Sequence, residues 1–284
     1  MLIRLGYDIE LENSRPQAVV AMLNVHPSRM ADLLEPDFLQ VTPDAPREEY
    51  IDSFGNRCVK ISAPAGILRL SNSTLIQDSG QPDPVDWNAV QAPVDQLPVG
   101  ILRFLLASRY CEVDKMSDLA WGLFGNCAPG WPCVQAICDW VHAQVAFGYN
   151  FARPTKTALD VSVEHQGVCR DFQHLAITLC RCMHIPARYA TGYLGDIGVP
   201  LAPCPMDFSA WFEVYLSGRW WTFDARHNQP RIGRVLIATG RDAADVAITT
   251  SFGTSWLRKF TVVTDEVPDL SSANTSTQPY AAAS

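Results

Sequence analysis

Hydrophobic periodicity changes partway along the chain, and this change constrains the fold more than any other feature. Over residues 3–12 apolar and polar residues alternate, and a period of two is typical of a half-buried β-strand. Beyond residue 98 apolar residues recur at helical spacing, and strand patterns return only after Pro186. Helices followed by antiparallel strands are typical of an α+β unit. We therefore expect an all-β unit followed by an α+β unit.

Breaks in this pattern give the expected domain boundaries. Residues 1–85 contain short strand-like stretches separated by Pro, Gly and Asn, which predicts a small N-terminal antiparallel β-sandwich. A Pro- and Asp-rich stretch, with the linker placed at 86–98, separates the sandwich from a core expected over 99–264. Residues 265–284 are rich in Ser, Thr and Ala and hold no Lys or Arg, a composition that predicts a disordered tail.

Within the core, helices are expected to precede strands. Helices are predicted over Pro98–Ala107, over Asp114–Phe124, from near Pro132, and from Cys169 to just before Pro186. Strands are predicted over Ala187–Leu194, Phe208–Leu216, Arg219–Asp224 and Arg234–Ala238. Ser217 and Gly218 would form a two-residue hairpin loop that pairs Leu216 with Arg219.

Charge and the length of apolar runs exclude several classes of partner. Asp and Glu outnumber Lys and Arg by 30 to 22, which gives a formal net charge of −8. Nucleic acids and anionic membranes both require a positive patch, so neither is expected as a partner. No apolar run approaches the roughly 18 residues of a membrane-spanning helix. The N-terminal alternation differs from the uniform apolar region of a signal peptide, so a cytoplasmic location is expected.

The chain has nine cysteines, and in a reducing cytosol most are expected to be small buried residues. Cys127, Cys133 and Cys138 are spaced six and five residues apart, which does not fit a structural zinc site. We therefore expect no metal and no cofactor.

Cys169 is the exception and the sharpest candidate for a nucleophile. It lies in the segment 167–172 at the start of a predicted helix, where unpaired N–H groups and the helix dipole stabilise a thiolate. Such positions lower a thiol pKa from about 8.5 to between about 3.5 and 7.5. The Cys169 N–H could also bind a developing oxyanion. We expect Cys169 to be the most acidic and most readily alkylated thiol, although spacing alone equally fits a half-buried capping cysteine.

Several sequence blocks between about residues 130 and 250 resemble the bacterial transglutaminase-like family. The blocks are 167–172 with the helix that follows, Ile185–Tyr189, Ala210–Tyr215, Trp220–Asp224 and Gly240–Ala247. The preceding sandwich is similar to the N-terminal domain of that family. The resemblance implies a papain-like α+β core, in a family that includes crosslinking enzymes, proteases, amidases and inactive relatives.

The resemblance also implies a Cys-His-Asp triad in that chain order. Its cysteine would be Cys169 and its acid Asp224, but Ser209 stands where the histidine is expected, just before Ala210. The predicted hairpin register places position 209 on the same sheet face as Asp224. A histidine at 209 would reach Asp224 whereas a serine is too short, so Ser209→His is expected to raise activity or create it.

His227 is the best of the remaining histidines, but a weak candidate for the base. It lies three residues beyond Asp224, so it points to the opposite face of a regular strand. It would serve only if a bulge or turn followed Ala225. We therefore predict that His227 is not the missing base, and that the other histidines are structural.

Thiol acyl transfer is the leading hypothesis for function. Cys169 would attack a carboxamide or amide carbon of a protein, peptide or other amide substrate, and the thioester would pass its acyl group to an amine or to water. The alternative is a catalytically silent transglutaminase-like binding module, which Ser209 favours and the presence of Cys169 and Asp224 opposes. A third reading, a redox-sensing cysteine, needs a resolving thiol that the sequence does not identify. The oligomeric state is left open.

Overall fold

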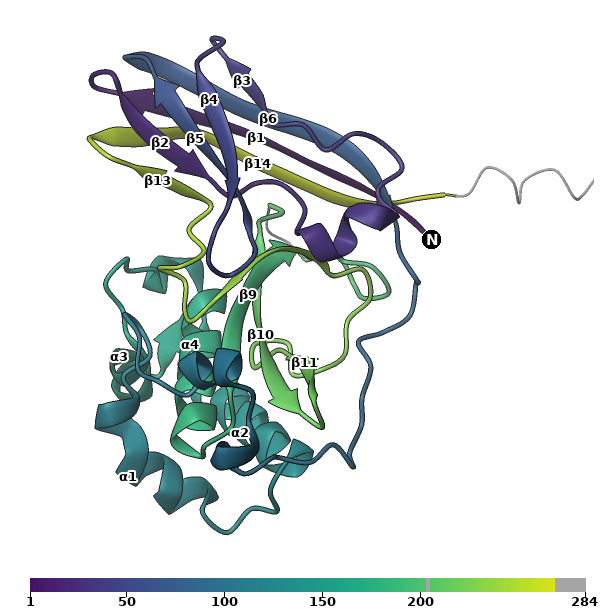
Figure 1. The fold of residues 1–284 in the computed structure, drawn as a ribbon, viewed down its shortest axis with the longest axis vertical. Coiled ribbons are helices and arrows are strands. Elements are labelled where there is room, and N and C mark those ends of the chain that lie inside the picture. The colour runs from purple at the N-terminus through teal and green to yellow at the C-terminus, as the bar shows by residue number, and fades with distance from the viewer. Residues whose placement is uncertain (203–204, 269–284) are drawn as a thin grey trace, which may run out of the picture.

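Two stacked units make up the part of the chain that the computed structural model describes, residues 1–202 and 205–268 (Figure 1). A β-sandwich lies above an α+β unit in which helices pack beside an antiparallel sheet. The predicted α+β fold with a preceding sandwich is thereby confirmed. Residues 78–98 leave the sandwich and run down the flank of the α+β unit (Figure 1).

The sandwich consists of two four-stranded sheets, with strand orders β14-β1-β6-β3 and β13-β2-β5-β4. Its strands are Leu2–Asn13 (β1), Gln17–Ala21 (β2), Gln40–Thr42 (β3), Arg47–Ile51 (β4), Arg57–Ala63 (β5), Gly66–Gln77 (β6), Thr249–Ser251 (β13) and Ser255–Val267 (β14). The alternating residues of β1 behave as predicted, since Ile3, Leu5 and Ile9 are buried in the core.

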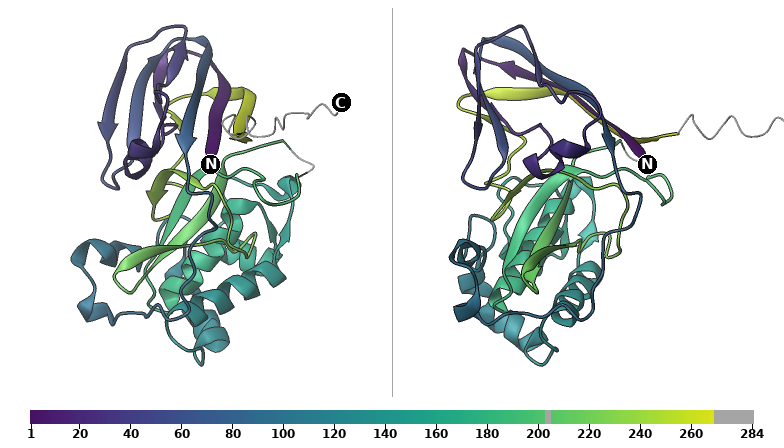
Figure 2. Two further views of the ribbon diagram at one scale, coloured as in Figure 1. Left: turned by 90° about the vertical axis from the view of Figure 1, so that its right-hand side faces the viewer. Right: turned by 45° about the vertical axis from the view of Figure 1, so that its right-hand side comes forward.

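The two C-terminal strands belong to the sandwich, and here the predicted boundaries are wrong. β14 pairs antiparallel with β1, from Leu2↔Val267 to Asn13↔Ser255. β13 pairs with β2 in the other sheet, and both views in Figure 2 show the yellow strands beside the purple ones. The core therefore does not extend over all of 99–264, and β14 continues into the predicted tail 265–284. Residues 269–284 lie outside the described part of the chain.

Four helices and two further sheets form the α+β unit in the described residues. The helices are Val113–Phe124 (α1), Trp131–Gln144 (α2), Ala158–Glu164 (α3) and Cys169–Cys182 (α4). The larger sheet has the order β11-β10-β9-β12, with β9 at Ala187–Tyr193, β10 at Ser209–Leu216, β11 at Arg219–Phe223 and β12 at Val235–Gly240. Ala146–Phe147 (β7) and Gln166–Gly167 (β8) form a short parallel pair. Short 3-10 helices occupy Pro27–Asp32, Val94–Gln96, Val99–Phe104 and Tyr149–Phe151.

The hairpin register agrees with the prediction. Leu216 pairs with Arg219, and the pairing continues to Phe212↔Phe223. Ser217 and Gly218 have φ values of 49° and 79°, the two positive values that a type I′ turn requires. The helix predicted over Pro98–Ala107 is instead a 3-10 segment, and α3 was not predicted.

α4 is the central helix of the α+β unit. It packs against α1, α2 and α3 on one side and against β9 and β10 on the other. Every residue from Asp171 to Cys182 is buried, and the buried Arg181 guanidinium donates to the Ala187 carbonyl at 2.9 Å. This packing fixes the first residue of α4, Cys169, relative to the sheet. No helix in the described ranges combines the length and hydropathy needed to cross a bilayer.

Candidate active site

Cys169 is the first residue of α4. Asp171 folds back over this helix start, and its Oδ2 accepts the N–H of Val168 at 2.9 Å. Gly167 makes room for this cap, because a Cβ at that position would lie only 2.6 Å from the Asp171 Cβ. The Gly-x-Cys-x-Asp pattern is thus a local device that starts the helix at the cysteine.

The pKa of Cys169 differs from the expectation based on the helix start. The residue is partly exposed, yet burial of the thiol raises its pKa to about 11, and the nearby Arg226 guanidinium only partly opposes this. Loss of hydration of the thiolate outweighs the helix terminus. The prediction that Cys169 is the most acidic thiol is therefore contradicted, because burial raises its pKa, whereas its ease of alkylation stays a prediction. Ionisation at neutral pH needs a proton acceptor.

His227 and Asp224 form a hydrogen-bonded pair, with Nδ1 of His227 2.8 Å from Oδ2 of Asp224. The prediction that these side chains lie on opposite faces is therefore wrong. β11 ends at Phe223, and the following residues form a turn instead of continuing the strand. A turn at this point is the condition under which the sequence analysis allowed His227 to act as the base. The turn brings the His227 imidazole back to the Asp224 carboxylate.

Asp224 itself makes the turn. Its Oδ1 accepts the backbone N–H groups of Arg226 and His227 at 3.0 and 3.1 Å. Its carbonyl accepts the N–H of Asn228 at 2.8 Å, and Asn228 has a left-handed φ of 50°. From α2, His142 donates through Nδ1 to the Arg226 carbonyl at 2.9 Å.

Two further side chains that the sequence did not single out hold Asp224. Gln173, one turn along α4 from Cys169, donates to Oδ1 at 3.0 Å. Arg234 donates to Oδ2 at 3.0 Å and to Asp83 at 2.8 Å. Although burial opposes ionisation, the charge of Arg234 and the hydrogen bond from His227 hold the pKa of Asp224 well below its usual range. The carboxylate therefore stays charged.

Ser209 lies at the start of β10 and is buried, with 8% of its surface exposed. Its carbonyl accepts the Thr191 hydroxyl at 3.1 Å. Among the other histidines, His174 is fully buried and accepts the Ala243 N–H at 3.1 Å. Burial lowers its pKa well below the usual value, as expected of a structural histidine.

Cys169, Ser209 and His227 meet in one small cavity of about 80 Å³. The polar side chains Asp196, Arg226 and Arg231 also line it. A second, larger cavity of about 360 Å³ also reaches Cys169. The structure thus brings together three of the four predicted site residues around one space, with the fourth, Asp224, directly behind His227.

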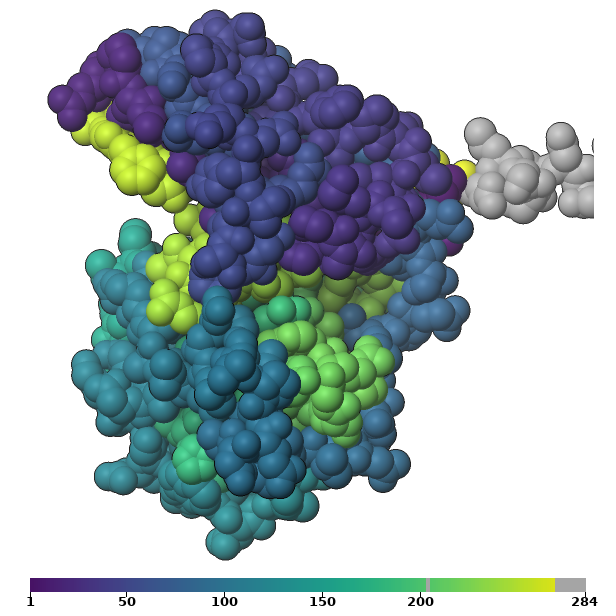
Figure 3. Space-filling view, in the orientation of Figure 1, coloured from purple at the N-terminus to yellow at the C-terminus, as the bar shows by residue number. Residues whose placement is uncertain are grey.

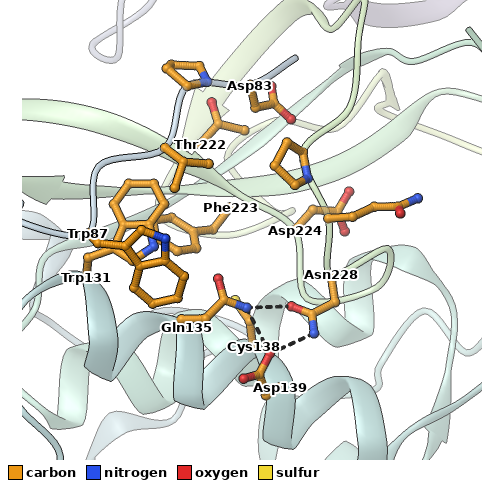
Figure 4. A pocket seen from close by; sticks show the side chains of 14 residues that line it. Asp83, Trp87, Trp131, Gln135, Cys138, Asp139, Thr222, Phe223, Asp224 and Asn228 are labelled. Atoms are coloured by element: carbon orange, nitrogen blue, oxygen red, sulfur yellow. Dashed lines mark hydrogen bonds between the residues drawn. The ribbon is translucent and has the colours of Figure 1, made fainter. Parts of the chain in front are cut away.

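Asp224 also borders a separate cavity of about 450 Å³ that does not reach Cys169. Trp87, Trp131 and Phe223 lie at one side of it, and a hydrogen-bonded group of Gln135, Asn228 and Asp139 lies at the other (Figure 4). Asn228 donates to Asp139 at 2.8 Å and accepts from Gln135 at 3.0 Å. These two hydrogen bonds connect the turn after β11 to α2. Within residues 1–202 and 205–268, no three His, Cys, Asp or Glu side chains are placed to ligate a metal ion.

Comparison with known proteins agrees with the fold. The family profile described as the transglutaminase-like superfamily matches residues 119–225, a range that contains Cys169, Ser209 and Asp224 but ends before His227. A proposed cysteine protease of Cytophaga hutchinsonii, known from its crystal structure, is 32% identical to the chain with a TM-score of 0.81. The similarity covers 100% of this chain and 94% of that protein.

A more distant relative has been found by sequence. The uncharacterized protein ML0607 of Mycobacterium leprae is 24% identical over 220 residues, which is 74% of this chain and 77% of the relative. The full-length match to the Cytophaga protein and the profile match around Cys169 together show that the chain belongs to the transglutaminase-like superfamily.

Proposed function

We propose that the protein is an enzyme that cleaves or transfers acyl groups through a thioester on Cys169. The observation that carries this proposal is the 2.8 Å contact between His227 and Asp224, with His227 and Cys169 lining the same cavity. A nucleophile, a base and a group that orients the base are the three parts that thiol acyl transfer requires.

The charged state of Asp224 assigns the protons. An ionised carboxylate only accepts hydrogen bonds, so Nδ1 of His227 carries the hydrogen and Nε2 is left with a lone pair. His227 Nε2 would take the proton of the Cys169 thiol as the sulfur attacks the carbonyl carbon of an amide. This transfer is needed because burial raises the pKa of the Cys169 thiol to about 11, so the thiol is mostly protonated near neutral pH.

The remaining steps follow from the same groups. When the tetrahedral intermediate collapses, the carbon–nitrogen bond breaks and His227 returns the proton to the leaving amine. Water or a second amine then attacks the thioester carbon while His227 accepts its proton. The carbon–sulfur bond breaks, and His227 returns the proton to the Cys169 sulfur. The N–H of Cys169, in the first turn of α4, would donate to the developing oxyanion.

His227 replaces the histidine that the family pattern places at position 209. The silent-module alternative depended on the absence of a base, and the His227–Asp224 pair supplies one, so we favour the enzyme. We propose a protein, peptide or other amide as substrate and a reducing compartment such as the cytoplasm, because the attack needs a free thiol.

The experiment is to trap the acyl-enzyme. Protein incubated with a mixture of casein peptides is quenched in acid, and intact mass and Cys169-containing peptides are measured. We expect a thioester adduct on Cys169, no adduct in Cys169→Ala, and a turnover about 10²–10⁴-fold lower in His227→Ala. His26→Asn, which removes an imidazole from the sandwich, should match wild type. Equal turnover in all four proteins would contradict the proposal.

A further inference from the structure

The larger cavity beside Cys169 is predominantly apolar and is built by both units. Its volume is about 360 Å³. Its apolar side chains include Pro154, Tyr189, Phe208, Ala210, Ile248 and Phe260. Phe260 lies on β14 of the sandwich and Ile248 directly precedes β13. The connection that carries Ile248 is part of the yellow surface between the two units in Figure 3.

The two guanidinium groups that line this cavity are already engaged, and burial raises the pKa of the third charged residue in its lining, Asp207. Arg153 forms ion pairs with Asp160 and Glu164 at 3.1 and 2.8 Å. Arg170 pairs with Asp171 at 3.4 Å and donates to the Arg153 carbonyl. Both guanidinium groups thus have partners of their own. The cavity therefore presents apolar surface to whatever lies beside the Cys169 sulfur.

A further cavity, of about 340 Å³ and with both apolar and polar side chains in its lining, adjoins this one along the sandwich. Ile248 and Phe260 line both cavities. Beyond them the apolar part of the second cavity is lined by Ile9, Leu11 and Leu257, and its polar part by Thr249, Ser251 and Ser255. Leu257 is 59% exposed. Apolar surface thus runs from the nucleophile, past Ile248 and Phe260, to the open edge between β13 and β14.

We infer that the acyl donor is a polypeptide segment with apolar side chains, and that the β-sandwich forms part of its binding surface. The inference rests on the proposed function for what happens at Cys169. A small amide would occupy only the first cavity, whereas an extended chain places alternate side chains on one side at intervals of about 7 Å. Two adjoining cavities that share an apolar wall suit two such side chains.

The test measures binding without chemistry, in the full-length Cys169→Ala variant. The probes are two fluorescein-labelled peptides, Gly-Leu-Leu-Gln-Leu-Leu-Gly and Gly-Ser-Ser-Gln-Ser-Ser-Gly, followed by fluorescence anisotropy. We expect the Leu peptide to bind at least about tenfold more tightly, because burial of one Leu side chain is sufficient for that ratio. Adding Phe260→Ala should remove most of this preference and leave the affinity for the Ser peptide within about twofold, since only apolar contact is lost.

Two matched variants separate contact from general destabilisation. Phe260→Leu retains an apolar side chain and should keep most of the preference. Phe38→Ala removes another exposed aromatic of the sandwich, 69% exposed and in neither cavity, and should change nothing. If Phe260→Ala fails to give a cooperative thermal melt, Ile248→Ala replaces it with the same expectation.

Equal affinity for the two peptides, or an equal effect of Phe38→Ala and Phe260→Ala, would overturn the inference. A Phe260-dependent preference for the Leu peptide supports it even if wild-type protein forms no thioester. The absence of a thioester in wild-type protein would instead count against the proposed function. A failure of the inference and a failure of the proposed function can therefore be distinguished.

Discussion

At the scale of single residues, Asp224 connects most groups of the candidate site. One of its oxygens accepts from His227 and Arg234, and the other accepts from Gln173 and two backbone N–H groups. A buried carboxylate needs such donors, since burial disfavours its charged form. Asp224 therefore orients the imidazole and stabilises the turn that carries it.

Asp224→Asn tests the charge separately from the shape of this side chain. We expect kcat to fall by about 10²–10⁴-fold, because the amide no longer fixes the tautomer of His227. The free energy of unfolding should fall by about 2 kcal/mol at pH 7, the scale of hydrogen bonds to a charged group. Activity assays and urea unfolding give the two quantities.

The pH dependence of that stability difference is a further check. Folding lowers the pKa of Asp224, so its stabilising contribution is present above the unfolded value of about 3.9 and is lost as pH falls. The difference between wild type and Asp224→Asn should therefore shrink from pH 7 to pH 3. A constant difference would mean that Asp224 is not ionised in the folded protein.

Ser209→His should give no gain in activity, contrary to the expectation from the family pattern. Asp224 is already paired with His227, and Ser209 is 8% exposed, so an imidazole at this position must displace its neighbours. We expect activity at or below wild type and a loss of roughly 1–3 kcal/mol in stability from overpacking. A rise of about tenfold or more in kcat/KM would show instead that position 209 can supply the base.

At the scale of elements, the end of β11 determines where the His227 side chain lies. The sequence pattern did not predict this strand end. The helix start at Cys169 and the register of the β10–β11 hairpin are local patterns, and both were predicted correctly. The position of His227 depends on where the strand gives way to a turn. That point is set by hydrogen bonds that the backbone N–H groups of the turn donate to Asp224, and by the hydrogen bond from His142 on α2. Strand alternation contains no signal for either.

Asn228 tests how much this turn positions His227. Its φ is 50° and its side chain binds Gln135 and Asp139. Asn228→Gly keeps the backbone conformation and removes the side-chain bonds, whereas Asn228→Ala also adds strain of about 1 kcal/mol. We therefore expect Asn228→Ala to be less stable than Asn228→Gly by that amount, and both to lose about tenfold in kcat, the order of one lost hydrogen bond of about 1.4 kcal/mol. Wild-type kcat in both variants would show that the turn holds His227 without these bonds.

At the scale of the whole molecule, the first and last strands of the described residues, β1 and β14, pair in one sheet. The pairing of β1 with β14 joins residues more than 240 positions apart, and non-local pairing of this kind leaves no local pattern in the sequence. The predicted core boundary therefore cut through the sandwich. The same pairing puts Phe260 in the lining of the larger cavity that reaches Cys169.

Two truncations test this dependence. A chain ending at Ile248 lacks β13 and β14, so β1 loses one of its two neighbouring strands along its whole length and becomes a sheet edge. The loss of β14 also uncovers buried apolar residues. We expect no cooperative thermal melt for this variant, because an unpaired sheet edge over an open core is not stable. A chain ending at Pro268 keeps both strands and should melt as the full chain does. A cooperative melt of the Ile248 truncation at the full-length midpoint would show that the sandwich does not need its C-terminal strands.

The rate of Cys169 alkylation by iodoacetamide tests the central claim most directly, because it needs no substrate. Peptide mass spectrometry would follow wild type and His227→Ala from pH 7 to pH 9, with the partly exposed Cys127 as an internal control. The claim that His227 takes the Cys169 proton predicts a reaction at pH 7 at least about 10²-fold faster in wild type. In His227→Ala the rate should rise about tenfold per pH unit, because the thiolate fraction of a thiol whose pKa lies above this pH range grows about tenfold per unit. Equal Cys169 rates in the two proteins, with Cys127 unchanged, would contradict the assignment of His227 as the base.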